Sequence, residues 1–163
     1  MRVNPYTSSV TSALRKSQLL LETDCAAPLQ RVAAQEAVVM HLWRAYRAFL
    51  AELAFQLQLD TEPESAQALA ERALAFGKAS GEAVELQELA LDPDSWLSRL
   101  QAAWVQLWSF AAESGSGQPA ANLIPLQNLS APGPVQLSGE LLRDWQSALS
   151  ELVRRQRAQS QEW

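Results

Sequence analysis

The sequence predicts an all-α protein, an up-and-down bundle of four main helices with an additional acidic helix and a long loop or strap before the last helix. Two observations lead to this fold class. Apolar residues recur every three or four positions over long segments, as they do on the buried side of a helix. Ala, Leu and Gln dominate the composition and β-branched residues are scarce, which favours helices over strands. At 163 residues, the chain fits one domain, residues 1–163, around a single core.

The first two predicted helices lie before residue 60. Asn4 can cap a helix that has Pro5 in its first position, and this helix should end before Asp24. The second helix should run from about Leu29 to Leu59, a stretch without Gly or Pro, and form the spine of the bundle. Two heptad rows mark its buried side: Val32, Val39, Tyr46 and Leu53, and Leu29, Glu36, Trp43, Leu50 and Leu57.

The next two predicted helices are short. Capping residues, proline and negative charge at 60–64 should open a helix over about 63–78. Gly77 and Gly81 interrupt the helical pattern, and a short acidic helix over 82–89 should follow them.

A further helix should begin near residue 92. Asp92 can cap it, Pro93 suits its first position, and Leu91 and Trp96 are spaced to form a hydrophobic staple. Apolar residues occupy much of the circumference of this helix. We therefore expect it to be buried between neighbouring helices.

A long loop or strap over 114–137 separates that helix from the last one. Gly and Ser fill 114–117, and Pro and Gly recur at 132–134. We expect its apolar residues to hold it on the bundle as a strap: Leu123, Ile124, Leu126, Leu129, Val135 and Leu137. The last helix should start at Ser138 and continue to the chain end. Near its C-terminus, where positive charge is favourable, are Arg154, Arg155 and Arg157.

Charge and the scarcity of reactive residues exclude several classes of function. The net charge of −5 argues against nucleic-acid binding, and residues 60–94 carry a local −7, since nine acidic side chains there outnumber two basic ones. Cys25 is the lone cysteine, so the chain cannot build a disulfide framework. His41 is the only histidine, so we expect no metal site, no cofactor and no catalytic triad. Without a signal peptide or a bilayer-spanning run, the expected location is the cytoplasm, away from membranes.

Two arginines beside aromatic residues form the first candidate site. Arg44 and Arg47 lie one turn apart on the long second helix, next to Trp43 and Tyr46. Arginine beside aromatic rings can hold a phosphate or a carboxylate, so these four residues could bind a small anionic ligand. The same arginines could instead pair with the acidic segment that follows, and the sequence leaves both possibilities open.

The six tryptophans provide the second candidate. Trp104, Trp108 and Trp145 belong to predicted helices, where large aromatic side chains fill cores or form subunit interfaces. The chain carries more large apolar side chains than one core obviously needs, so we expect an exposed patch. The leading hypothesis is a non-enzymatic interaction or scaffold protein that self-associates as a homodimer through these residues or binds another protein. The alternative is the anion-binding bundle.

Several short motifs are spread along the chain. They are Asn4-Pro5-Tyr6-Thr7, His41-Leu42-Trp43 with Tyr46, Phe49, Leu50 and Leu53, Ser95-Trp96-Leu97, Asn122-Leu123-Ile124 and Glu162-Trp163. Through these motifs the whole chain resembles an uncharacterised bacterial family of small helical proteins, a domain of unknown function. The resemblance implies a helical bundle with an unassigned role, and none of the motifs is a catalytic signature.

Overall fold

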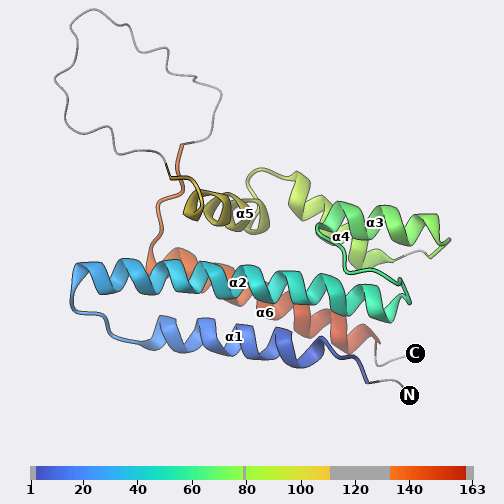
Figure 1. Ribbon diagram of the computed structural model, residues 1–163, viewed down its shortest axis with the longest axis horizontal. Coiled ribbons are helices and arrows are strands. Elements are labelled where there is room, and N and C mark those ends of the chain that lie inside the picture. The colour runs from blue at the N-terminus through green and yellow to red at the C-terminus, as the bar shows by residue number, and fades with distance from the viewer. Residues whose placement is uncertain (1–2, 79, 111–132, 161–163) are drawn as a thin grey trace, which may run out of the picture.

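The structure, a computed structural model, describes residues 3–78, 80–110 and 133–160 (Figure 1). These residues form helices and no strand, which confirms the all-α prediction. The helices are α1 (Thr7–Glu22), α2 (Pro28–Gln56), α3 (Ala66–Ala75), α4 (Gly81–Leu91), α5 (Trp96–Leu107) and α6 (Gly139–Ser160). Over the described ranges, no helix combines the length and apolar character needed to cross a membrane.

The helices form two groups on either side of α2. The long helices α1, α2 and α6 lie side by side, and the shorter α3, α4 and α5 lie together along the opposite side of α2 (Figure 1). Helix α2 has 29 residues and α5 has only 12, so α5 covers part of the length of α2. The largest buried side chains come from both groups and meet around α2: Trp145, Phe49, Leu42, Leu50, Leu69, Leu86, Leu97, Leu100, Leu142 and Leu149.

The N-terminal caps of the helices agree in part with those predicted from the sequence. Asn4 Oδ1 accepts a hydrogen bond from the Tyr6 backbone N–H at 3.0 Å, as a capping residue does, although the helix itself begins at Thr7. Ser65 and Ser80 cap α3 and α4, and each hydroxyl oxygen accepts from the backbone N–H three residues ahead at 3.1 Å. The boundaries of these helices therefore differ from the predicted ones by a few residues.

The predicted start of α5 is wrong. Helix α4 continues to Leu91, and the Asp92 N–H still donates to the Glu88 carbonyl, so Asp92 closes α4 rather than opening α5. The cap of α5 is Ser95, whose Oγ accepts from the Ser98 N–H at 3.1 Å. Leu91 is exposed and cannot form the predicted staple with Trp96.

Helix α5 is buried on one side only, contrary to the prediction that it lies between neighbours. Leu97, Leu100 and Ala103 face the core, whereas Val105 on the opposite side is exposed. The short α5 therefore lies on the surface of the bundle.

Residues 133–137, the part of the predicted strap that the structure describes, are attached to α5. Val135 and Leu137 pack against the core, and the Gln106 side-chain amide bonds both backbone groups of Val135, accepting at 2.8 Å and donating at 3.3 Å. The remainder of the predicted strap, 114–132, lies outside the described residues, as do 161–163 of the predicted last helix.

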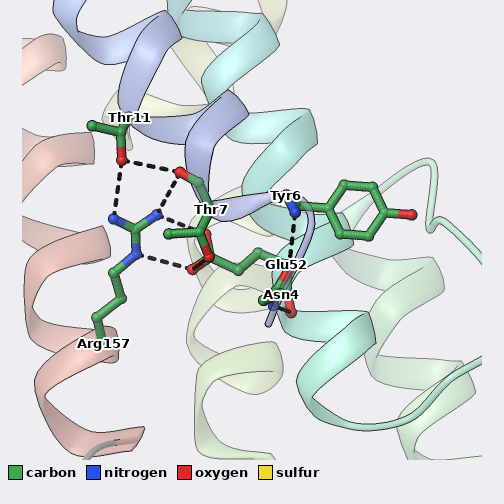
Figure 2. Close-up of polar contacts among 6 residues, drawn as sticks. All are labelled: Asn4, Tyr6, Thr7, Thr11, Glu52 and Arg157. Carbon is green, nitrogen blue, oxygen red and sulfur yellow. Dashed lines mark hydrogen bonds and ion pairs between the residues drawn. The ribbon is translucent and has the colours of Figure 1, made fainter. Parts of the chain in front are cut away.

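A buried ion pair joins α2 to α6. Glu52 is 1% exposed, and its two carboxylate oxygens accept hydrogen bonds from Arg157 Nε and Nη2, each at 2.9 Å (Figure 2). Two parallel bonds of this kind are the strongest geometry for an arginine and a carboxylate. The C-terminal arginines therefore do more than complement a helix end: Arg155 pairs with Glu85 on α4, and Arg157 turns inward.

Helix α1 is tied to the same ion pair (Figure 2). The Thr7 hydroxyl donates to Glu52 Oε1 at 3.1 Å, and Arg157 donates to the Thr7 carbonyl and to Thr11 Oγ1, each at 3.3 Å. The Asn4 side chain donates to the Glu52 carbonyl at 2.9 Å. The first, second and last helices thus meet at one saturated polar cluster.

We expect Arg157→Met to lower the free energy of unfolding by about 3–5 kcal/mol, because Glu52 would stay buried without its cation. Denaturant unfolding followed by circular dichroism measures this. Arg154→Met is the matched control, since Arg154 pairs with Glu151 on the surface of the same helix, and it should cost far less than Arg157→Met. Replacing both partners, as Glu52→Leu with Arg157→Met, should recover most of the loss. Equal losses for Arg157→Met and Arg154→Met would contradict a structural role for this pair.

Candidate functional site

Four aromatic side chains form a continuous cluster where α5 lies on α2. Trp43 stacks on Trp104, with ring centroids 5.8 Å apart and planes inclined by 14°. Trp43 also contacts Tyr46 at 5.1 Å, and Trp104 contacts Trp108 edge-on at 5.4 Å. We call Trp43, Tyr46, Trp104 and Trp108 the aromatic cluster. Residues predicted for two separate sites, on two helices, therefore belong to one structure.

The aromatic cluster leads from the core to the surface. Tyr46 is buried, Trp43 and Trp104 are half-buried, and Trp108 is 54% exposed. Helix α5 runs opposite in direction to α2 (Figure 1). Because Trp108 follows Trp104 by one turn, it lies toward the N-terminal half of α2.

The N-terminal half of α2 leaves part of its apolar side uncovered. Leu29, Val32 and Met40 are 80%, 48% and 46% exposed, and Glu36 lies exposed among them. These four residues, which we call the open face, share a side of the helix at a spacing of three or four residues. The same side is buried farther along α2, at Leu50 and Ala54. The open face is thus the continuation of a core-forming side beyond the reach of α5.

The four predicted ligand residues differ in how far they are buried. Arg44 is exposed, Arg47 is half-buried, and Tyr46 is buried in the core. In the described part of the chain, neither arginine forms an ion pair with the acidic segment. Two of these acidic side chains have partners elsewhere, since Glu62 accepts from the Tyr6 hydroxyl and Glu85 from Arg155. The predicted pairing of Arg44 and Arg47 with this segment is therefore wrong.

Tyr46 is anchored rather than available to a ligand. Burial raises the pKa of its hydroxyl to about 12, and the backbone N–H of Ala66 opposes that rise by donating to the oxygen. The side chain therefore stays uncharged at physiological pH. Beside it, Arg47 Nε is buried and has no hydrogen-bond partner among the described residues.

Trp145 belongs to the core. It is 2% exposed and packs with Leu142 and Leu149 of α6. A side chain enclosed by its own chain cannot form a surface contact, so Trp145 is not an interface residue. Of the three predicted tryptophans, Trp108 is the most exposed and Trp104 supports it.

His41 is half-buried on α2. Its partial burial, with Lys16 and Arg44 nearby, lowers its pKa, so the ring is neutral at physiological pH. No group of three or more His, Cys, Asp or Glu side chains that could hold a metal ion occurs within the described ranges.

Three of the hollows on the described surface are well formed. One of about 910 Å³ separates the outer side of α5 from residues 133–136. A second, about 490 Å³, lies between α1 and α6, and a third, about 220 Å³, contains Cys25, Arg31 and Arg143. None of the three is lined by a predicted ligand residue or by the aromatic cluster.

We expect the stacked rings of Trp43 and Trp104 to stabilise the contact between α2 and α5 beyond simple burial. A double-mutant cycle of Trp43→Leu and Trp104→Leu should give a coupling free energy of about 0.5–1.5 kcal/mol in unfolding experiments. The matched cycle of Trp43→Leu with Trp96→Leu should give additive losses, since Trp96 lies two turns away at the other end of α5. Additive losses in the first cycle would show that the stacking contributes nothing.

Comparison with known proteins places the chain in a family. No curated protein and no solved structure matches it. Residues 10–163 match the model of a "Family of unknown function (DUF6586)", a range that includes every helix from α2 to α6 and most of α1. This agrees with the resemblance to an uncharacterised helical family found from the motifs. Because the match covers nearly the whole chain, the protein belongs to the family of unknown function DUF6586.

Proposed function

We propose that the protein is a non-enzymatic interaction protein of the cytoplasm that self-associates through the open face of α2 and the exposed end of the aromatic cluster. The observation that carries this proposal is the uncovered apolar side of α2, where Leu29, Val32 and Met40 are exposed. Trp108, more than half exposed, lies toward the same half of the helix.

The composition of this surface supports contact with a protein. Adjoining exposed apolar side chains on a folded domain usually mark an interaction site. Tryptophan and methionine are enriched at such interfaces, and the stacked rings behind Trp108 hold it in place at little cost in side-chain entropy. Because Trp108 is backed by Trp104 and Trp43, it is presented to a partner as a rigid group.

A second candidate function is the binding of a small anion beside Arg47. The observation that favours it is the buried Arg47 Nε, which lacks a hydrogen-bond partner among the described residues and lies next to the aromatic cluster. A buried N–H without a partner has given up its hydrogen bonds to water, which costs free energy. An anion that reached this N–H would therefore gain a strong hydrogen bond.

We expect light scattering at low micromolar concentration to give a mass of twice 18.0 kDa. Val32→Glu and Trp108→Glu should each raise the dissociation constant of the dimer at least about tenfold, because each places a charge in an apolar contact. Both variants should keep the helical circular dichroism signal. Leu74→Glu is the control, since Leu74 is more exposed than either residue but lies on α3, and it should leave the dimer intact.

A mass near 18.0 kDa at all concentrations would exclude self-association. If Trp108→Glu unfolds the chain, Trp108 is a core residue and does not belong to the interface. In that case, the effect of Val32→Glu decides whether the open face takes part.

For the anion-binding candidate, we expect inorganic phosphate to quench the tryptophan fluorescence in a saturable way, since Trp43 lies beside Arg47. Arg47→Met should abolish the saturable change, and Arg72→Met should not, because Arg72 lies on α3 beside Phe76. A linear response, or an unchanged curve for Arg47→Met, would eliminate this candidate.

A further inference from the structure

One row of exposed residues on α2 carries opposite charges at equal distances from a central methionine. Val32, Glu36, Met40 and Arg44 follow one another at intervals of four residues, and all four are exposed. At 1.5 Å per residue, Glu36 and Arg44 lie about 12 Å apart along the helix axis, too far to bond each other. Neither has an ion-pair partner among the described residues.

Rows of residues four apart are the ridges by which helices most often pack. In the commonest crossing, at about −50°, the ridge of one helix runs parallel to the ridge of its neighbour. A second copy related by a two-fold axis presents the same ridge in the reverse order. With the axis at Met40, Glu36 of each copy lies beside Arg44 of the other, so a single contact forms two ion pairs.

The charges would be unfavourable in other arrangements of the same ridge. Copies packed in parallel would place Glu36 beside Glu36 and Arg44 beside Arg44, and like charges repel. The ridge is therefore complementary to itself only when it is reversed, which is the condition for a closed dimer rather than an open chain of molecules.

We propose that a second copy of this chain docks antiparallel on the open face of α2, with the two-fold axis at Met40 and reciprocal ion pairs between Glu36 and Arg44. This inference rests on the proposed self-association and specifies its geometry. Met40 contacts its symmetry mate at the centre, and Val32 extends the apolar contact. Trp108 of each copy flanks the contact on the side of α5.

Charge reversal tests this arrangement directly. Glu36→Arg alone and Arg44→Glu alone should each raise the dimer dissociation constant at least about tenfold in sedimentation equilibrium, because each homodimer then contains two repelling pairs. The double variant Glu36→Arg with Arg44→Glu restores both pairs and should return the constant to within about threefold of the wild-type value. Glu64→Arg, a reversal at an exposed position outside α2, is the control and should leave the constant unchanged.

A mixture of the two single variants gives the sharpest result. In the heterodimer, Arg at position 36 meets Glu at position 44, and the native Arg44 meets the native Glu36, so both pairs are favourable. We expect the mixture to dimerise with the wild-type constant although neither variant does so alone. This rescue in trans cannot result from an effect on the folding of either chain.

The possible failures are distinguishable. If the wild-type protein stays monomeric, both the proposed self-association and this geometry are overturned, even if something else covers the open face. A wild-type dimer that ignores both reversals, or that is weakened by them without rescue in the mixture, leaves the self-association in place and overturns the antiparallel contact at Met40.

Discussion

The register of the long helices α1, α2 and α6 depends on the ion pair between Glu52 and Arg157. A carboxylate that is 1% exposed must have its charge compensated, and Arg157, 105 residues farther along the chain, supplies the positive charge and two hydrogen bonds. Thr7 and Asn4 bring the start of the chain to the same place. This polar cluster is satisfied in one register of the three helices, which adds to the specificity of the apolar packing.

The two halves of α2 have different surroundings. The helix is long because nothing in residues 29–59 interrupts it, and the ion pair fixes its C-terminal half within the bundle. Helix α5 has 12 residues, and near its C-terminal end Trp104 stacks on Trp43 of α2. The same amphipathic pattern therefore produces a core at Leu50 and an exposed surface at Leu29.

The sequence predicted the helices well because periodicity, prolines and capping residues act locally. It predicted the aromatic cluster as two unrelated candidates, since nothing local brings Trp43 to Trp104. It failed at Asp92 because Asp and Ser cap helices equally well, and only the length of α4 decides between them. The ion pair was missed altogether. Its one signal was Glu52, a single charge within the apolar run 49–55, and the identity of its partner depends on tertiary structure.

The clasp between Gln106 and Val135 has a consequence for the entropy of the chain. Its two hydrogen bonds join residues 29 positions apart, one near the end of α5 and one before the start of α6. Closing a chain segment costs entropy that grows only slowly with its length, by about 0.6 kcal/mol for each doubling. The free energy of forming the clasp therefore depends little on how many residues separate its two partners.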